Sequence, residues 1–562
     1  MRLLRFRALS AAGLALLLCA GARAQPLAFR LGGPGSEQGT RVAAGPDGTL
    51  VVGGLYADAF DGLPSGNTLR AFVAAFAPTG ERRALVALSG PTATVSLSGV
   101  GADAAGNLYA GGFFGGTVDF DPGPGVAERT ASASTLFDAF VASYTPAGAL
   151  RYAVQIPGQF QRDATGFTVS TDGTASFLGT FNGTVDADPG PGVRGLTAQG
   201  TGAFVVSLHA NAVLRSVVPI LSPNTNRGRG LALGPAGRLV VGGEIDGTTD
   251  FDPGPGTATL TTAGSLDAFV AQYTPDGAFV SAFRIGGAGA DVLTAVGTGA
   301  DGAVVIAGTV QGDVDVDPGP AATVISGGGR FAAAYTSTTA LRLAVNYANG
   351  PTPRAVTVSA DGSVVVAGDF VGTFNFTSGG PGGVRTAVGT DAFAVSYAVG
   401  GSAGFVATLA GDGPGQAFGV APRPGGGVVV VGTFAGVADV DPGPASVPLV
   451  SAGATDAFAV AYTAAGGLAT DAEGSARAAL RRTLTAAPNP ARSGQTVLLR
   501  GLDGPARADL VDASGRVVAR LFDGSAGAET SVRLPAGLAP GVYVVRAVSA
   551  AGVASARVAI LR

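Results

Sequence analysis

The stretch Gly242–Gly287 decides the fold, and it reads GGEIDGTTDFDPGPGTATLTTAGSLDAFVAQYTPDGAFVSAFRIGG. The Asp267-Ala268-Phe269 triplet in its middle returns, in whole or in part, along most of the chain. The corresponding phenylalanines are Phe72, Phe140, Phe204, Phe269, Phe331, Phe393 and Phe458. Successive members are 62 to 68 residues apart, so the chain contains seven copies of one unit. A fixed period of this kind indicates a repeat architecture.

Each copy contains four short apolar runs, which predict four strands that we call a, b, c and d. In the fifth copy the runs are 293–297, 303–309, 331–335 and 341–346. The b run is almost unbroken in β-branched residues, which is typical of a strand buried on both faces. Asp-Gly pairs between a and b, and Pro-x-Gly triplets between c and d, predict short hairpin turns.

Four antiparallel strands joined in this way form one blade of a β-propeller, and propellers commonly have about 4–8 blades. The sequence therefore predicts a seven-bladed β-propeller over residues 25–468. The last copy stops after its c strand at 457–463, but Leu27–Gly33 resembles the d strand Phe283–Gly287. We expect this N-terminal strand to complete the seventh blade and leave no free edge. An open solenoid would need polar caps, and the sequence has none.

Composition fits a large exported β protein. Of 562 residues, 46% are hydrophobic and 13% charged, and 92 glycines and 34 prolines allow many turns. Every basic residue is arginine, the net charge is −4, and no basic patch indicates nucleic-acid binding.

Residues 1–24 predict a secretory signal peptide. Three arginines in 2–7 precede the apolar run 11–20, and 22–24 is a small-x-small cleavage site. That run is too short to span a bilayer, and no later stretch looks transmembrane. The only cysteine, Cys19, leaves with the peptide, so we expect a mature chain without disulfides. The predicted destination is the periplasm, and then the outer cell surface or the medium.

After the repeats, an alanine-rich, charged stretch at 469–483 predicts a linker, and 484–562 predicts a separate small β domain. Its landmarks are Pro488-Asn489-Pro490, a hairpin at 511–518, Leu534–Leu538, Gly541-Val542-Tyr543 and the basic end 557–562.

Both regions resemble known families. The VxGxF, DAFVAxYTPxG and IGG elements make residues 25–468 similar to SBBP repeat proteins, named for the seven-bladed β-propeller. Residues 484–562 resemble the type A sorting domain of type IX secretion substrates, with PNP, DxxGRxV, GxY and a basic terminus in the expected order. That resemblance implies an Ig-like sandwich read by the secretion machinery, with the cargo released or attached to the cell. The alternative is an ordinary Ig-like adhesion domain.

The most distinctive motif of the b–c loops is DxDPG, which occurs in five intact copies. Its aspartates are Asp119 and Asp121, Asp186 and Asp188, Asp250 and Asp252, Asp315 and Asp317, and Asp439 and Asp441. Alternating carboxylates on an extended segment point to the same side, which suits Ca²⁺. Calcium prefers about 6–8 oxygen ligands, however, and two carboxylates supply too few. Pro-Gly after an aspartate also fits a turn capped by that side chain. We favour the turn and keep calcium as the metal hypothesis; no other cofactor is expected.

Other polar residues predict structure more readily than catalysis. Asp138, Asp267, Asp391 and Asp456 precede c strands, where we expect them to hydrogen-bond a neighbouring loop. The single histidine, His209, is expected to be a surface or core residue. Glu37 and Glu244 are the only acids on the long-loop face outside the repeat pattern, and they are the weak candidates for an active site.

These features favour a non-enzymatic surface or secreted module with an unknown extracellular ligand. The alternative is an extracellular glycan hydrolase or lyase. Such an enzyme needs a paired acid and base in one cleft, whereas the acids here recur from copy to copy.

The calcium hypothesis predicts stabilisation by millimolar calcium. A ligand that binds only the folded state at a hundredfold excess over Kd adds about 2.7 kcal/mol. The melting temperature should rise with calcium and fall with chelator, and Asp250→Ala with Asp252→Ala should remove part of the shift. Equal melting temperatures in calcium and in chelator would leave only the turn.

Overall fold

The computed structural model describes residues 27–59, 63, 70–90, 92–132, 137–161, 166–377, 383–469, 485–500, 504–512, 517–526, 529–549 and 552–561. Within these ranges the regular structure is all-β, apart from the single 3-10 turn η1 (Pro235–Gly237). The chain divides into two compact units, Pro26–Thr470 and one that holds Asp471–Arg562. The predicted signal peptide 1–24 and nearly all of the linker 469–483 lie outside the described residues.

In the larger unit the described strands follow the a, b, c, d order of the repeats in seven groups. The first four groups are β2 (Glu37–Ala44), β3 (Leu50–Tyr56), β4 (Arg70–Phe76), β5 (Arg82–Leu88); β6 (Thr94–Ala102), β7 (Leu108–Gly115), β10 (Phe137–Tyr144), β11 (Leu150–Phe160); β12 (Gly166–Val169), β13 (Ala175–Asp186), β14 (Gly195–Leu208), β15 (Leu214–Ile220); β16 (Asn226–Leu233), β17 (Leu239–Ile245), β20 (Asp267–Tyr273), β21 (Phe279–Ile285). The others are β22 (Val292–Thr298), β23 (Val304–Val310), β26 (Gly329–Tyr335), β27 (Leu341–Ala348); β28 (Thr352–Val358), β29 (Val364–Asn375), β30 (Val384–Tyr397), β31 (Ala403–Gly411); and β32 (Gly415–Pro422), β33 (Val428–Phe434), β36 (Asp456–Tyr462), β1 (Ala28–Leu31).

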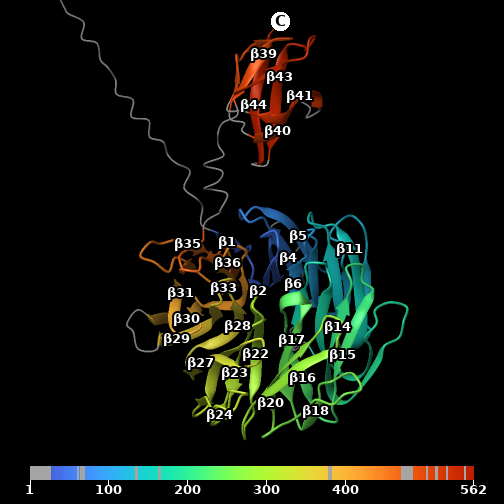
Figure 1. Cartoon of the computed structure of the whole chain (residues 1–562), viewed down its shortest axis with the longest axis vertical. Coiled ribbons are helices and arrows are strands. Elements are labelled where there is room, and N and C mark those ends of the chain that lie inside the picture. The colour runs from blue at the N-terminus through green and yellow to red at the C-terminus, as the bar shows by residue number, and fades with distance from the viewer. Residues whose placement is uncertain are drawn as a thin grey trace, which may run out of the picture. The chain divides into compact units, whose positions relative to one another are not determined.

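The a strands contact one another in a closed cycle. β2 contacts β6, and the series continues through β12, β16, β22, β28 and β32, which contacts β2 again. Figure 1 shows the groups following one another in chain order, from blue through green and yellow to orange, about a common middle. The hydrophobic clusters lie between successive groups, because one cluster joins Val51 and Val73 of the first group to Phe114 and Phe140 of the second.

The local sequence explains the strands and turns. The run Val304–Ile306 in β23 is fully buried, as expected for a b strand that faces a neighbouring sheet on each side. Gly302 in the a–b turn has φ +80° and Gly277 in the c–d turn has φ +87°. A side chain at such positive φ is strained, so the predicted glycine turns are confirmed.

The N-terminal strand completes the seventh group, as the sequence predicts. β1 pairs antiparallel with β36, and Phe29 faces Ala459 across this pair. The Nη1 atom of Arg30 lies 2.7 Å from the Oδ2 atom of Asp456, whose side chain is fully buried. The first and last described strands of the unit are therefore joined by a backbone ladder and an ion pair.

Strand a carries a β-bulge in most groups. In β16 the register shifts between Gly228 and Gly230, so that Arg229 is the extra residue opposite β17. The same shift occurs at Thr40, Ser98, Thr294, Arg354 and Phe418. A bulge bends its strand and redirects a side chain. These residues consequently recur at one structural position.

Short hairpins occupy four of the b–c connections. They are β8 (Thr117–Asp119) with β9 (Glu128–Thr130), β18 (Thr248–Asp250) with β19 (Thr259–Thr261), β24 (Val314–Asp315) with β25 (Val324–Ile325), and β34 (Val437–Asp439) with β35 (Pro448–Val450).

The smaller unit contains two sheets around one core. One sheet is formed by β37 (Thr485–Ala487), β39 (Thr496–Arg500) and β42 (Glu529–Arg533), and the other by β38 (Ala491–Arg492), β44 (Gly552–Leu561), β43 (Gly541–Ser549), β40 (Gly504–Val511) and β41 (Val517–Ala526). Val497 and Val532 from the first sheet pack with Leu510 and Val545 from the second. β40 and β41 form the hairpin predicted at 511–518, although its tip, 513–516, lies outside the described residues. No helix in the described part of the chain is long and apolar enough to cross a membrane.

The Arg30–Asp456 pair gives a direct test of how the unit is joined. Arg30→Met should lower the free energy of unfolding by about 1–3 kcal/mol, because the buried Asp456 carboxylate loses its cation while the partly exposed arginine moderates the loss. Urea unfolding of the purified chain measures this. The control is Arg83→Met, which removes an exposed pair with Asp47 and should change stability by less than about 1 kcal/mol. If both variants lower the free energy of unfolding equally, the Arg30–Asp456 pair does not stabilise the unit more than an exposed pair does.

Candidate functional site

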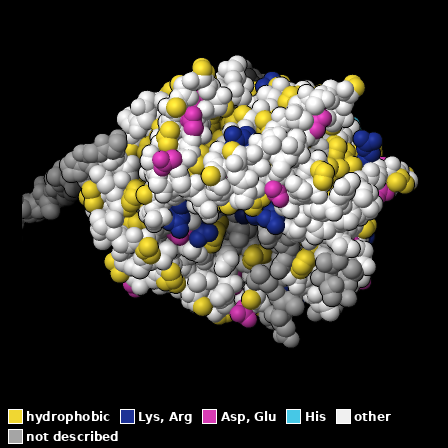
Figure 2. Space-filling model, turned by 90° about the horizontal axis from the view of Figure 1, so that it is seen from below, with side chains coloured by type: hydrophobic (Ala, Val, Ile, Leu, Met, Phe, Trp, Pro, Cys, Tyr) yellow, Lys and Arg dark blue, Asp and Glu magenta, His cyan; other side chains and the backbone are white. Residues whose placement is uncertain are grey.

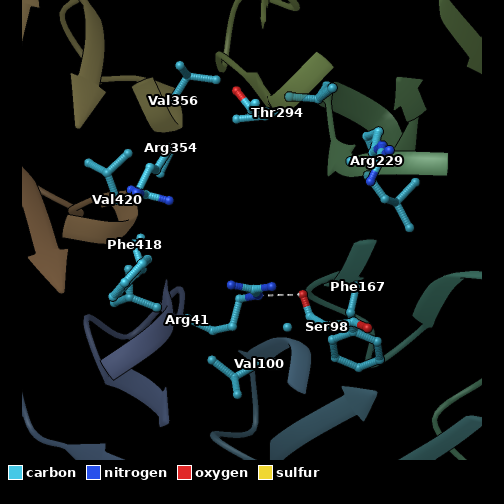
Figure 3. A pocket seen from close by; sticks show the side chains of 18 residues that line it. Arg41, Ser98, Val100, Phe167, Arg229, Thr294, Arg354, Val356, Phe418 and Val420 are labelled. Atoms are coloured by element: carbon cyan, nitrogen blue, oxygen red, sulfur yellow. Dashed lines mark hydrogen bonds between the residues drawn. The ribbon is translucent and has the colours of Figure 1, made fainter. Parts of the chain in front are cut away.

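A cavity of about 220 Å³ lies where the seven a strands meet. Each strand contributes at least one side chain to its lining, and we call it the central cavity. The residues concerned include Arg41 of β2, Ser98 of β6, Phe167 of β12, Arg229 of β16, Thr294 of β22, Arg354 of β28 and Phe418 of β32. Figure 3 shows these side chains around an open middle, with arginines on different sides of it.

Arg41 has no acidic partner among the described residues. Its Nε donates to the Ser98 carbonyl at 2.9 Å, and its Nη1 donates to the Thr40 carbonyl at 2.7 Å. The dashed line in Figure 3 marks its bond to Ser98. Burial away from water lowers the pKa of Arg41 to about 10. The guanidinium remains protonated at neutral pH, so the cavity holds a positive charge that no described carboxylate balances.

Arg229 and Arg354 are held by acids on the neighbouring b strands. Arg229 Nε and Nη2 donate to the two oxygens of Glu244 at 2.7 and 3.1 Å, and the Glu244 side chain is fully buried. Arg354 forms an ion pair with Asp369, and its guanidinium lies 5.4 Å from the centre of the Phe418 ring. Paired charges of this kind orient the arginine without adding net charge.

Apart from the three arginines, Ser98 and Thr294, the side chains of the lining are apolar. Val42, Val100, Val296, Val356 and Val420 occupy one register position in five different a strands. No aspartate or glutamate belongs to the described lining. The arrangement can therefore attract and orient a ligand, but arginines that stay protonated do not supply a general base near neutral pH.

The aspartates of the DxDPG loops form hydrogen bonds within their own loops. Asp250 Oδ1 accepts the backbone N–H groups of Asp252 at 3.1 Å and Ala258 at 2.8 Å, and Asp252 Oδ1 accepts that of Gly254 at 2.8 Å. The same pattern holds at Asp119 and Asp121, Asp186 and Asp188, Asp315 and Asp317, and Asp439 and Asp441. The intervening residue, Phe251 in this copy, is fully buried.

These bonds are the ones that the turn interpretation requires. In two of the loops the hairpin also reaches the preceding group: the Asp119 N–H donates to the Ser89 carbonyl at 2.8 Å, and Asp439 pairs with Ala410. Among the described residues no group of three or more His, Cys, Asp or Glu side chains is placed to hold a metal ion. Calcium binding at the DxDPG loops stays a prediction.

The aspartates at the start of the c strands are all buried. Asp267 forms an ion pair with Arg284, and Asp456 pairs with Arg30. Asp138 accepts hydrogen bonds from Ser132, Gln155 and Gly158. They link the c strand to nearby loops and to the d strand, in agreement with a local structural role.

The two acids singled out from the sequence each accept hydrogen bonds from a fixed partner. Glu244 is committed to Arg229, as described above. Glu37 is fully buried, and its Oε2 accepts the Gly33 N–H at 2.9 Å. Burial, together with the carboxylates of Asp456 and Asp58, raises the pKa of Glu37. His209 is exposed next to a tight turn.

Sequence reasoning missed the arginines of the central cavity. Two signals were available. One is the Arg227–Gly230 stretch, where arginines alternate with glycines inside a predicted apolar strand. The other is the register position of Arg41, where five of the other a strands have Gly99, Gly230, Ala295, Ala355 and Gly419.

A second hollow of about 530 Å³ lies beside the sixth repeat. Its lining includes Tyr347, Tyr397 and Phe374, together with Asn375 and Thr377 of the copy that departs from DxDPG. It has no charged lining residue in the described part of the chain. The surface in Figure 2 carries few charged side chains, with blue arginine side chains nearest a hollow in the middle of that face.

Comparisons with known proteins do not show a family for this chain. No family model matches it, and no curated protein matches it. Among solved structures, one is titled as the type-IX secretion surface component PorZ of Porphyromonas gingivalis, with 10% identity and a TM-score of 0.20, covering 95% of this chain and 100% of that one. Another is titled as a eukaryotic initiation factor, with 10% identity and a TM-score of 0.31, covering 76% and 98%. Similarity this weak carries no argument about fold or function.

Asp391 differs from Asp267 and Asp456 because the d strand beside it offers no arginine at the corresponding position. Phe269 faces Arg284 in the fourth group, whereas Phe393 faces Thr408 in the sixth. Burial raises the pKa of Asp391 from 3.8 to about 6. The folded state therefore binds the Asp391 proton more tightly than the unfolded state does. The resulting contribution to the free energy of unfolding is fully present below about pH 4 and is lost as the pH rises through about 6.

Thr408→Arg should therefore supply the missing cation. The variant should gain up to about 3 kcal/mol of stability at pH 8 and little at pH 4, because the Asp391 carboxylate becomes paired when ionised. Urea unfolding at the two pH values measures the difference. Asp391→Asn, which cannot ionise, should also flatten the pH dependence. If the free energy of unfolding depends on pH in both variants as it does in the original chain, Asp391 is not the group responsible.

Proposed function

We propose that residues 25–468 form a seven-bladed β-propeller that acts as a non-enzymatic binding module, with the central cavity as its ligand site. The closed cycle of a-strand contacts supports the propeller. The observation that carries the binding role is the cavity itself, because seven strands distant in sequence converge on it and three of them bring an arginine. Ligand sites commonly combine apolar walls with a few convergent polar groups.

The alternative, a glycan hydrolase or lyase, has less support. A glycosidase needs two carboxyl groups that flank the scissile bond. The described lining of the central cavity offers none. Of the two acids that the sequence nominated, Glu244 holds Arg229 with both oxygens, and Glu37 receives the Gly33 N–H.

We further propose that the protein is exported to the periplasm by its signal peptide and then crosses the outer membrane by type IX secretion, to remain on the surface or be released. The partner in this step is the secretion machinery, and the part that it reads is 484–562. The order of motifs from Pro488 to the C-terminus supports the route. The separate two-sheet core of this unit is compatible with an independent sorting domain.

Binding and hydrolysis are distinguished in one assay. The purified chain is incubated with a panel of acidic and neutral glycans and peptides, and both retention and product release are measured. We expect retention of at least one ligand without new reducing ends or unsaturated products. Release of either product, abolished by Glu244→Gln or Glu37→Gln, would contradict the non-enzymatic role.

Deletion of 484–562 tests the proposed route. The truncated chain should fold, because the larger unit has its own core, but it should accumulate in the periplasm instead of reaching the medium or cell surface. Fractionation of cells that express full-length and truncated protein measures this, with circular dichroism of the periplasmic product as the folding control. Normal extracellular levels of the truncated protein would exclude a sorting role.

A further inference from the structure

Arg41 occupies a position that the other a strands reserve for the smallest residues. It faces Gly53 in β3, just as Gly99 faces Gly111 and Gly230 faces Gly242. At this position space is scarce, since a Cβ added to Gly99 would lie 2.8 Å from Phe167. The first group therefore places a long cation where its equivalents place hydrogen or a methyl group.

The charge of the cavity follows from its three arginines. Glu244 balances Arg229, and Asp369 balances Arg354. No described carboxylate balances Arg41, so the cavity carries one net positive charge. Arg41 is half-buried, so part of its uncompensated charge is removed from water at a cost that a bound counter-charge reduces.

Hydrogen-bond donors remain available around this charge. Arg41 uses Nε and Nη1 for two backbone carbonyls, which leaves Nη2 without a protein partner among the described residues. Arg354 binds Asp369 through Nε, which leaves its two Nη atoms. Figure 3 shows both guanidinium groups extending toward the open middle.

We propose that the central cavity binds a small organic acid through one carboxylate, with Arg41 as the principal donor and Arg354 as a second one. A single negative charge matches the single net positive charge, whereas a phosphate group carries about −1.5 to −2 at pH 7. The valines of the wall suit the carbon skeleton of the acid. A volume of about 220 Å³ exceeds by severalfold the roughly 30 Å³ that one water occupies in the liquid, which leaves room for such a molecule.

This inference rests on the proposed binding role and names the chemistry of its ligand. The test is calorimetric titration of the full chain with acetate, lactate and glucuronate at low ionic strength. Acetamide, lactamide and the methyl ester of glucuronate are the neutral controls, and phosphate and sulfate are the competing anions. We expect saturable binding of at least one carboxylate, with its neutral analogue at least about tenfold weaker.

Variants separate binding from folding. Arg41→Met keeps an unbranched side chain but removes the guanidinium and its charge, so carboxylate affinity should fall at least about tenfold while the melting temperature without ligand stays level or rises. Arg41→Lys should retain part of the affinity. The matched control is Arg83→Met. Arg83 forms an exposed pair with Asp47 and lies in β5, at the opposite edge of the sheet from β2, so this variant should bind the carboxylate as the original chain does.

Several outcomes would overturn the inference. They are equal affinity for a carboxylate and its neutral analogue, tighter binding of phosphate or sulfate, and no carboxylate binding by the original chain. The last result is independent of whether Arg41→Met folds. If the chain binds no carboxylate but retains a neutral glycan or peptide, only the carboxylate inference is wrong. If it releases glycan products, both that inference and the proposed non-enzymatic binding role are wrong.

Discussion

The pairing of β1 with β36 is the constraint on which the larger unit depends. Every other group takes its four strands from consecutive sequence, but the last group obtains its d strand from the opposite end of the repeat region. Without Phe29 beside Ala459, the backbone groups of β36 would form a free edge. The buried Asp456 carboxylate would also lose Arg30. A single strand of four residues therefore completes the last group of the cycle.

Close approach of strands a and b within a group is the second constraint, and it explains the b-strand glycines beside the bulges. A Cβ on Gly243 would lie 1.9 Å from the Arg227 carbonyl, and one on Gly368 would lie 1.9 Å from the Thr352 carbonyl. The residues that follow them, Glu244 and Asp369, are then directly beside the bulges of strand a. The same packing that demands glycine thus places an acid within reach of Arg229 and Arg354.

Sequence reasoning reached the strands and the glycine turns because their signals recur from copy to copy. It reached the β1–β36 junction because Leu27–Gly33 resembles the d strand Phe283–Gly287. It also predicted a local structural role for the c-strand aspartates, because arginine or glycine replaces them in some copies. The repeat pattern alone does not show that arginines converge on the central cavity, and the reason is physical. Arg229 and Glu244 are fifteen residues apart, and only a bulge, whose position periodicity does not report, turns the arginine toward the middle.

Departures from the repeat carry more information about function than the repeat itself. The DxDPG aspartates recur with the same hydrogen bonds in five loops, which is what turn formation requires of each copy separately. Arg41 occurs once, at a position where its equivalents are glycine or alanine, and the fold gains no ion pair from it. Arg229 and Arg354 show that this chain can place a buried acid beside a cavity arginine when only orientation is needed. The absence of such an acid beside Arg41, among the described residues, sets the electrostatic character of the whole cavity.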